Sequence, residues 1–183
     1  MAVAPANVQK NAGLIESLRM GTRAEDLFKE AAERAGARIL LTASSDQDRT
    51  EHWDYLVQFP DYPKARKVDV KAMKSLERGS APQDEWVCLE LHGTAAASQG
   101  WLFGGHSDMI AFQSSVGFTL VHRRKLVQLL PPLVVREFVP RSSLALYKIY
   151  SRKGYEEVTW IRFADLFRLG VVFKSLLLVD GLG

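Results

Sequence analysis

Cysteine is almost absent from this chain of 183 residues, which carries a single one, Cys88. One cysteine excludes an internal disulfide and indicates a reducing compartment. Because Cys88 lies in the apolar run 86–91, we interpret it as a core residue rather than a nucleophile. Residues 1–9 have neither a basic start nor a long apolar block, so no secretory signal is predicted and a cytoplasmic location is expected.

Long hydrophobic runs and common cofactor motifs are also missing. The longest apolar run, 171–179, is interrupted by Lys174 and Ser175 and is too short to cross a bilayer. We therefore expect no membrane association and interpret this run as a buried strand or a contact surface. Gly104 and Gly105 are not followed by the residues of a nucleotide-binding loop, and the four histidines have no zinc spacing. The sequence therefore predicts neither an activity driven by nucleotide hydrolysis nor a structural zinc site.

The composition is that of an ordinary globular protein, with 47% hydrophobic and 25% charged residues. It predicts an N-terminal arm (1–20) and one domain (21–183), in which residues 140–183 form an extension packed on the core. The net charge is +3, but residues 1–90 are slightly acidic and residues 91–183 are basic. The acidic half could hold a cation while the basic half contacts phosphates; alternatively, basic runs such as 123–125 simply keep a helix hydrated.

Two alternating segments, 52–57 and 67–73, predict neighbouring strands at the centre of the chain. Side chains two apart on a strand point to the same side, so Asp69 and Lys71 should share a face. A hairpin across the 60–67 connection would bring Asp54 to that face as well. Two carboxylates held together repel each other unless a cation or a proton lies between them, and Mg²⁺ or Mn²⁺ is the natural occupant. Such an ion, with a lysine beside it, has the chemistry of phosphodiester hydrolysis.

A helix over 23–35 should precede these strands, and its first turn has two interpretations. Thr22 and Glu25 have the spacing of a capping box, in which Glu25 bonds back to the helix start. Alternatively, Glu25 overhangs the strand ends and assists the chemistry. Gly36 should end the helix, 38–43 should form a strand, and 44–50 a polar loop.

The remaining elements are expected to complete the sheet and its cover. The pattern predicts strands at 86–91, 107–113, 117–121, 144–150 and 156–162, and helices at 99–103, 123–130 and 163–169. Glu90, on the first of these strands, is either an accessory carboxylate or a hydrated strand end. Basic side chains in the connections are expected to contact nucleic acid, or else to be merely flexible: Lys64, Arg66, Lys67, Lys74, Arg78, Arg152 and Lys153.

The order of a helix bearing Glu25, then Asp54, then Asp69-Val70-Lys71 resembles the PD-(D/E)xK nuclease superfamily, which includes restriction enzymes and Holliday-junction resolvases. The resemblance covers roughly residues 20–125, including 83–87, 100–104 and 108–112. This combination of segments is similar to small phage-type members of the superfamily. Trp53 stands where the motif's name has proline.

The resemblance implies an α/β fold with a mixed central β-sheet flanked by helices, a restriction-endonuclease-like core and a C-terminal β-hairpin/helix extension. It further implies that Asp54 and Asp69 bind Mg²⁺ or Mn²⁺, that Lys71 positions the attacking water, and that Glu25 is an assisting acid. The expected partner is DNA, cut as an endonuclease or exonuclease. Because nucleases that cut both strands commonly work as dimers, a homodimer is one expected assembly. The alternatives are a catalytically inactive nucleic-acid-binding or phage assembly protein, and a phage interaction module that uses 171–179.

Overall fold

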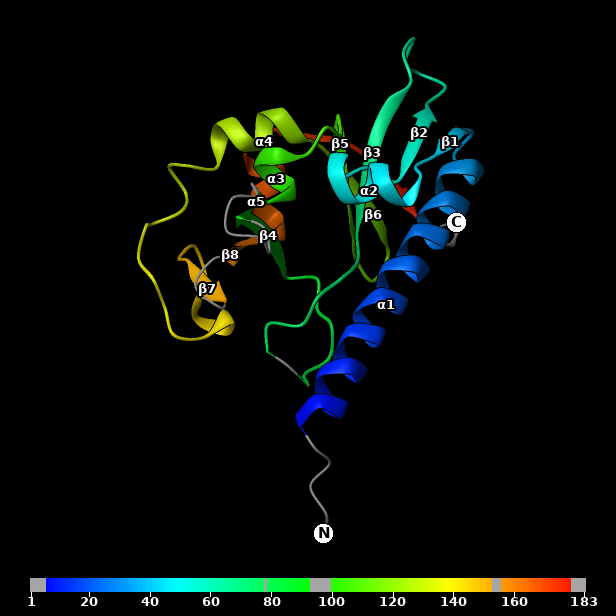
Figure 1. The fold of residues 1–183 in the computed structure, drawn as a ribbon. Helices are drawn as coiled ribbons and strands as arrows, with labels where there is room; N and C mark the ends of the chain where they lie inside the picture. Colours follow the sequence, from blue (N-terminus) through cyan, green and yellow to red (C-terminus); the bar gives the residue numbers. More distant parts are fainter. Residues whose placement is uncertain (1–5, 78, 93–99, 153–155, 179–183) are drawn as a thin grey trace.

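The fold was analysed in a computed structural model, which describes residues 6–77, 79–92, 100–152 and 156–178 (Figure 1). The helices are α1 (Ala6–Arg34), α2 (Ser45–Glu51), α3 (Trp101–Gly104), α4 (Arg123–Leu129) and α5 (Phe163–Arg168), with a 3-10 turn η1 (Ser142–Leu144). The strands are β1 (Arg38–Thr42), β2 (Tyr55–Gln58), β3 (Arg66–Lys71), β4 (Trp86–His92), β5 (Met109–Gln113), β6 (Gly117–His122), β7 (Tyr150–Arg152), β8 (Glu156–Arg162) and β9 (Val172–Leu177).

The main sheet is mixed and has six strands in the order β1-β2-β3-β5-β6-β9. Its strands pair antiparallel except β3 and β5, which are parallel. The connection between these two parallel strands contains β4 and α3. A second sheet of three strands has the order β4-β8-β7. The expected mixed α/β fold with helices against a central sheet is therefore confirmed.

Each face of the six-stranded sheet has its own core. On one face α1 packs through Ala24, Phe28 and Ala32 against alternate strand residues such as Val68 and Val70. Full burial of a side chain such as Phe28 contributes roughly 1.5–3 kcal/mol. On the other face the second sheet, α3, α4 and α5 form the second core. Figure 1 shows this arrangement, with α1 on one side of the main sheet and the smaller sheet on the other.

The alternation of β5 shows how one strand serves both cores. Met109 and Ala111 belong to the core beneath α1, whereas Ile110 and Phe112 belong to the second core. Successive side chains on a strand point to opposite faces, so a strand covered on both sides is apolar throughout. Because Val68 and Val70 of β3 lie in the first core, Asp69 and Lys71 must point toward the second.

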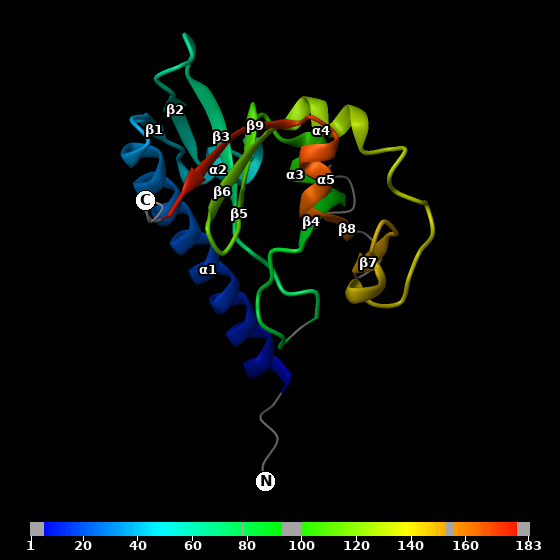
Figure 2. The same cartoon turned by 180° about the vertical axis from the view of Figure 1, so that it is seen from behind.

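The start of the first helix was predicted wrongly. Residue 22 is not a helix cap, because α1 runs without a break from Ala6 to Arg34 and Thr22 lies inside it. The predicted capping box between Thr22 and Glu25 is therefore absent, and residues 6–20 are helical rather than a loose arm. Gly21 costs a helix only about 1 kcal/mol relative to alanine, which the good helix formers around it can offset. The N-terminal part of α1 extends beyond the main sheet in both views (Figures 1 and 2).

The expected polar loop at 44–50 is also wrong, because these residues form most of α2. Ser44 is its N-cap: its side chain accepts a hydrogen bond from Gln47 N, and the Gln47 side chain accepts one from Ser44 N. This reciprocal pair is a capping box, with serine and glutamine at the required spacing. His52 ends the helix in a left-handed conformation, at φ 53°.

The C-terminal third contributes to both sheets. β8 pairs with β4 in the second sheet, and β9 pairs with β6 at the edge of the main sheet (Figure 2). The strand expected at 144–150 is wrong over most of its length: η1 occupies Ser142–Leu144, and β7 (Tyr150–Arg152) shares only Tyr150 with the prediction. Among the described residues, no helix is both long and apolar enough to span a membrane.

Candidate functional site

The candidate site lies where β2 begins and β3 ends. The two strands pair antiparallel with Tyr55 opposite Val68, as the hairpin prediction requires. Just before β2, Asp54 N donates to Val68 O at 2.8 Å, and Val70 N donates to Asp54 Oδ2 at 2.6 Å. These two bonds fix Asp54 against β3, and its side chain is buried, at 8% exposure.

Asp69 and Lys71 meet on β3, as their spacing predicts. Lys71 Nζ lies 2.6 Å from Asp69 Oδ1. The Asp69 side chain is 2% exposed and the Lys71 side chain is 22% exposed, so the carboxylate is buried while part of the lysine side chain reaches solvent. The other oxygen, Asp69 Oδ2, is buried and has no hydrogen-bond partner among the described residues. A buried charged oxygen without a partner is costly and calls for a cation, a proton or a donor.

The electrostatics of the two aspartates confirm that they are crowded. Burial raises the pKa of Asp54 to about 8, and the Asp69 carboxylate contributes to the same direction. Burial also raises the pKa of Asp69, although the Lys71 ammonium partly offsets this. Burial alone would lower the pKa of Lys71, but the adjacent Asp69 carboxylate outweighs burial and the pKa rises. Both carboxylates therefore resist ionising together unless a further positive charge is present.

This donor set fits a divalent cation that prefers oxygen. Carboxylate oxygens are the ligands that Mg²⁺ and Mn²⁺ favour, and the partnerless Asp69 Oδ2 is an available one. Within the described ranges, no group of three or more His, Cys, Asp or Glu side chains is arranged to hold a metal ion. Asp54 and Asp69 are the two carboxylates that this cluster brings together.

Glu25 lies on α1, half-buried, and within electrostatic reach of this cluster. Its pKa is raised by burial first, then by Asp48 and Asp26, with a smaller contribution from Asp69, while Lys71 lowers it. Since α1 continues through Thr22, the side chain is not used to cap the helix. Because α1 covers the face of the sheet opposite to the one toward which Asp69 and Lys71 point, Glu25 acts on the cluster through longer-range electrostatics rather than through a direct contact.

Two residues that the sequence did not single out also lie near the cluster. His52 is half-buried, and its pKa is lowered by burial and by the Lys71 ammonium. Asp48, one helical turn earlier, raises the pKa of Glu25 and of Asp69. Asp48 lies in the first turn of α2 and His52 is its C-cap, so the Ser44 and Gln47 capping box was the signal that could have located them.

Glu90 lies on β4, in the second sheet rather than on a neighbour of β3. Burial raises its pKa, and its charge in turn raises the pKa of Lys71, so the two side chains face a common region. A cavity of about 20 Å³ lies between the sheets, lined by Lys71, Trp101, Trp86 and other side chains. This volume is enough for about one water molecule.

The basic side chains expected to contact nucleic acid have different surroundings. Lys67 Nζ lies 2.6 Å from Glu51 and 4.7 Å from the centre of the Trp53 ring. Arg152 forms a bidentate ion pair with the Glu156 carboxylate. Lys64 and Lys74 are exposed, and Arg66 is half-buried with its Nε buried and unpaired among the described residues; Arg78 and Lys153 lie outside those residues.

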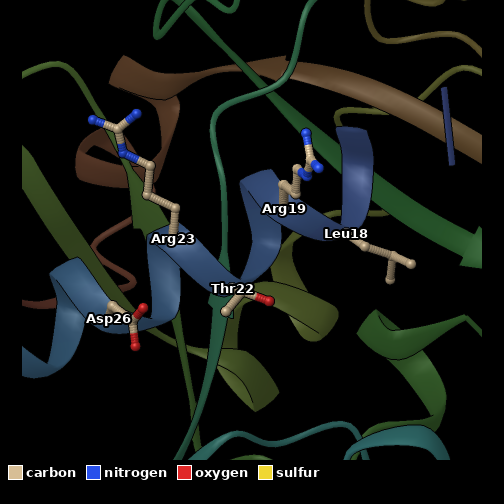
Figure 3. Close-up of a pocket in the computed structure, with 5 residues that line it drawn as sticks. All are labelled: Leu18, Arg19, Thr22, Arg23 and Asp26. Carbon is tan, nitrogen blue, oxygen red and sulfur yellow. The ribbon is translucent and has the colours of Figure 1, made fainter. Parts of the chain in front are cut away.

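A larger hollow, about 440 Å³, lies away from this cluster. It follows the exposed side of α1 and is lined by Leu18, Arg19, Thr22, Arg23 and Asp26 (Figure 3). Figure 3 shows the two arginine side chains pointing to the same side of the helix. All the lining residues come from one helix, and the hollow holds no close pair of buried charges, so size alone does not make it the candidate site.

Comparison with known proteins adds no relative: no protein-family model, curated protein or solved structure matches this chain.

Proposed function

We propose that this chain is a metal-dependent nuclease that hydrolyses DNA phosphodiester bonds at the cluster of Asp54, Asp69 and Lys71. The observation that carries this proposal is the meeting of two buried carboxylates and one ammonium group, with Asp69 Oδ2 left without a partner among the described residues. The order of helix, aspartate and Asp-Val-Lys strand supports a restriction-endonuclease-like core. It also supports the resemblance to PD-(D/E)xK nucleases.

Asp54 and Asp69 would hold Mg²⁺ or Mn²⁺, which when bound polarises a phosphate and makes a water molecule more acidic. Asp54 is held ready by the hydrogen bond from Val70 N, so it needs no rearrangement to present its carboxylate. Asp69 uses one oxygen for Lys71 and keeps the other for the cation. A preorganised pair of this kind loses little conformational entropy on binding.

Lys71 would hold the attacking water and neutralise charge that develops on the phosphate. Its ammonium is paired with Asp69 and the side chain as a whole is 22% exposed, so the proposal places the phosphate on the part of Lys71 that is open to solvent. Positive groups aimed at the developing charge are a large source of rate enhancement in such sites. Glu25 would act as the assisting acid, because its pKa is raised by burial and by the carboxylates around it.

The exposed Lys74, three residues after Lys71, would contact the DNA backbone near the cluster. Lys64 lies in the connection between β2 and β3, at the opposite end of the hairpin, and would contact the backbone farther from the cluster. Lys67 and Arg152 are already paired with carboxylates, so DNA would have to compete for them. We expect the protein to act in the cytoplasm, and as a homodimer if it cuts both strands of a duplex.

A catalytically inactive nucleic-acid-binding or phage assembly protein on the same scaffold is the second candidate. One observation favours it: Asp69 and Lys71 already satisfy each other's charge at 2.6 Å, which is what a purely structural ion pair would do. Such a protein would bind DNA equally well with and without a divalent cation.

The deciding experiment incubates the protein with labelled branched, single-stranded and duplex DNA in Mg²⁺, in Mn²⁺ and in EDTA. We expect metal-dependent cleavage of at least one substrate, and its loss in Asp69→Asn. Binding without cleavage of any substrate would favour the inactive scaffold. Equal cleavage by Asp69→Asn would show that another site or a contaminant cuts the DNA.

A further inference from the structure

The Lys71 ammonium has a second neighbour besides Asp69. Its Nζ lies 4.8 Å from the centre of the Trp101 ring, within the range of a cation–π contact. Lysine is a flexible side chain with many rotamers, so one contact to Asp69 does not fix its direction. An ion pair at 2.6 Å from β3 and an aromatic ring from α3 together do.

Close packing of the chain on either side of α3 holds the Trp101 ring in place. Residue 100 must be glycine, because a Cβ there would lie 2.6 Å from Glu90 O on β4. A Cβ at Gly105 would overlap the carbonyl oxygen of Trp101 itself. Beyond it, His106 N donates to Glu51 O at 2.6 Å, which ties the end of α3 to the end of α2. The helix is therefore clamped between the second sheet and the segment that precedes Asp54.

A buried arginine strengthens the same clamp. Arg123, at 9% exposure, donates to Leu102 O at 2.9 Å and to Ser107 O at 2.8 Å. Leu102 O is one of the carbonyl groups that a helix end leaves unpaired, so the guanidinium replaces a missing helical partner. Burying an arginine for backbone contacts alone is costly, and here it fixes the segment that carries Trp101.

We propose that Trp101 is a positioning residue that directs the Lys71 ammonium toward Asp69 and the reacting phosphate. This inference rests on the proposed nuclease function for its purpose, but the contact itself can be measured without any cleavage. Trp101 is 6% exposed and also packs near Phe112, with ring centres 6.2 Å apart. A residue that only filled space could be replaced by leucine as well as by phenylalanine, whereas a ring that faces a cation could not.

The test compares Trp101→Phe and Trp101→Leu with a matched control, Trp86→Leu. Trp86 lines the same small cavity, but its ring faces Arg162, at 5.4 Å, instead of Lys71. Melting temperatures and amide NMR spectra establish that each variant is folded. If Trp101→Leu does not fold, Trp101→Phe still gives the comparison.

The first readout is the NMR shift of the Lys71 ε-methylene protons in lysine-labelled protein, assigned with Lys71→Met. A ring above the ammonium moves these protons upfield. We expect the upfield shift in the wild type and in Trp86→Leu, a smaller one in Trp101→Phe, and none in Trp101→Leu. A wild-type shift equal to that of exposed lysines would overturn the proposal, whether or not the protein cuts DNA.

The second readout is steady-state cleavage. We expect Trp101→Leu to lower kcat by about threefold to thirtyfold, the range that a cation–π contact supplies, with KM within about twofold. Trp101→Phe should recover part of that loss, and Trp86→Leu should keep kcat near wild type. Equal losses in Trp101→Phe and Trp101→Leu would overturn the positioning role. Absence of cleavage by the wild type would refute the nuclease proposal instead and leave the NMR result to decide the contact.

Discussion

Replacing Asp54 by asparagine should make the metal-free protein more stable, and increasingly so as the pH rises. The pKa of Asp54 is about 8 in the folded chain, against 3.8 for an unperturbed aspartate, because burial and the Asp69 carboxylate disfavour its charge. Between these two values the folded chain binds a proton that the unfolded chain has lost. The charge of Asp54 therefore does not reduce the free energy of unfolding below pH 3.8. Between pH 3.8 and about 8 that free energy falls steadily as the pH rises.

The magnitude follows from the two pKa values. At pH 7 the unfavourable contribution of Asp54 is about 4 kcal/mol, an upper bound because water can relieve part of the burial. Asparagine carries no charge, and its side-chain oxygen can still accept the hydrogen bond from Val70 N. The variant should therefore keep the hydrogen bond from Val70 N and lose the cost of burying the Asp54 charge.

The assay is urea unfolding in EDTA at pH 5, 7 and 8, followed by tryptophan fluorescence. The stability difference between Asp54→Asn and the wild type should grow by about 1 kcal/mol per pH unit. Asp61→Asn is the control, because Asp61 is exposed and, among the described residues, forms its ion pair with Lys174, at 3.1 Å. Excess Mg²⁺ or Mn²⁺ should stabilise the wild type but not Asp54→Asn. An Asp54→Asn variant that is less stable than wild type at pH 7, or a difference that does not change with pH, would refute the reasoning.

Four further outcomes are expected from the same cluster. Asp69→Asn should abolish cleavage while DNA binding is retained or increased in a gel-shift assay, because a charged ligand is removed at nearly constant volume; cleavage at the wild-type rate would exclude Asp69. Lys71→Met should abolish turnover but keep manganese binding in calorimetry, and a loss of affinity as large as that of Asp69→Asn would contradict a separate role for the ammonium. Glu25→Gln should not lower the melting temperature, since α1 needs no cap at Thr22 and burial already disfavours the Glu25 charge, and it should slow cleavage at least about tenfold; an unchanged rate would remove Glu25 from the site. Ser44→Ala should lower the free energy of unfolding by about 0.5–2 kcal/mol in urea titrations, and a neutral result would mean that the capping box of α2 is not formed in solution.

Local pattern predicted the strands of the site because their geometry is local. A two-residue alternation fixes which face a side chain takes, and the short connection between β2 and β3 fixes their pairing. Asp54, Asp69 and Lys71 could therefore be placed together from the sequence. The same kind of local rule failed at Thr22, where a capping-box spacing lies inside a longer helix. It was overlooked at Ser44, where the capping box is real.

Contacts between distant segments could not be predicted in this way. Nothing in the spacing of Trp101 and Lys71 indicates that the ring faces the ammonium, because α3 reaches the site through the packing of Gly100 and Gly105. The strand that bears Glu90 was predicted correctly, but its membership of a second sheet depends on β8, far along the chain. The packing of two sheets around the candidate site is a tertiary feature. Hydrophobic periodicity predicts a strand but does not indicate which sheet the strand joins.

The position of β9 has a consequence for how the protein is made. This strand is the last described element of the chain, and it covers the edge of β6, whose Phe118 and Leu120 are buried. A ribosome releases the chain from its N-terminus, so the other five strands of the main sheet emerge while that edge is still open. An uncovered apolar edge is a template for pairing with other chains. The growing polypeptide thus remains open to aggregation until β9 is synthesised, and a chain terminated before Val172 would keep that hazard permanently.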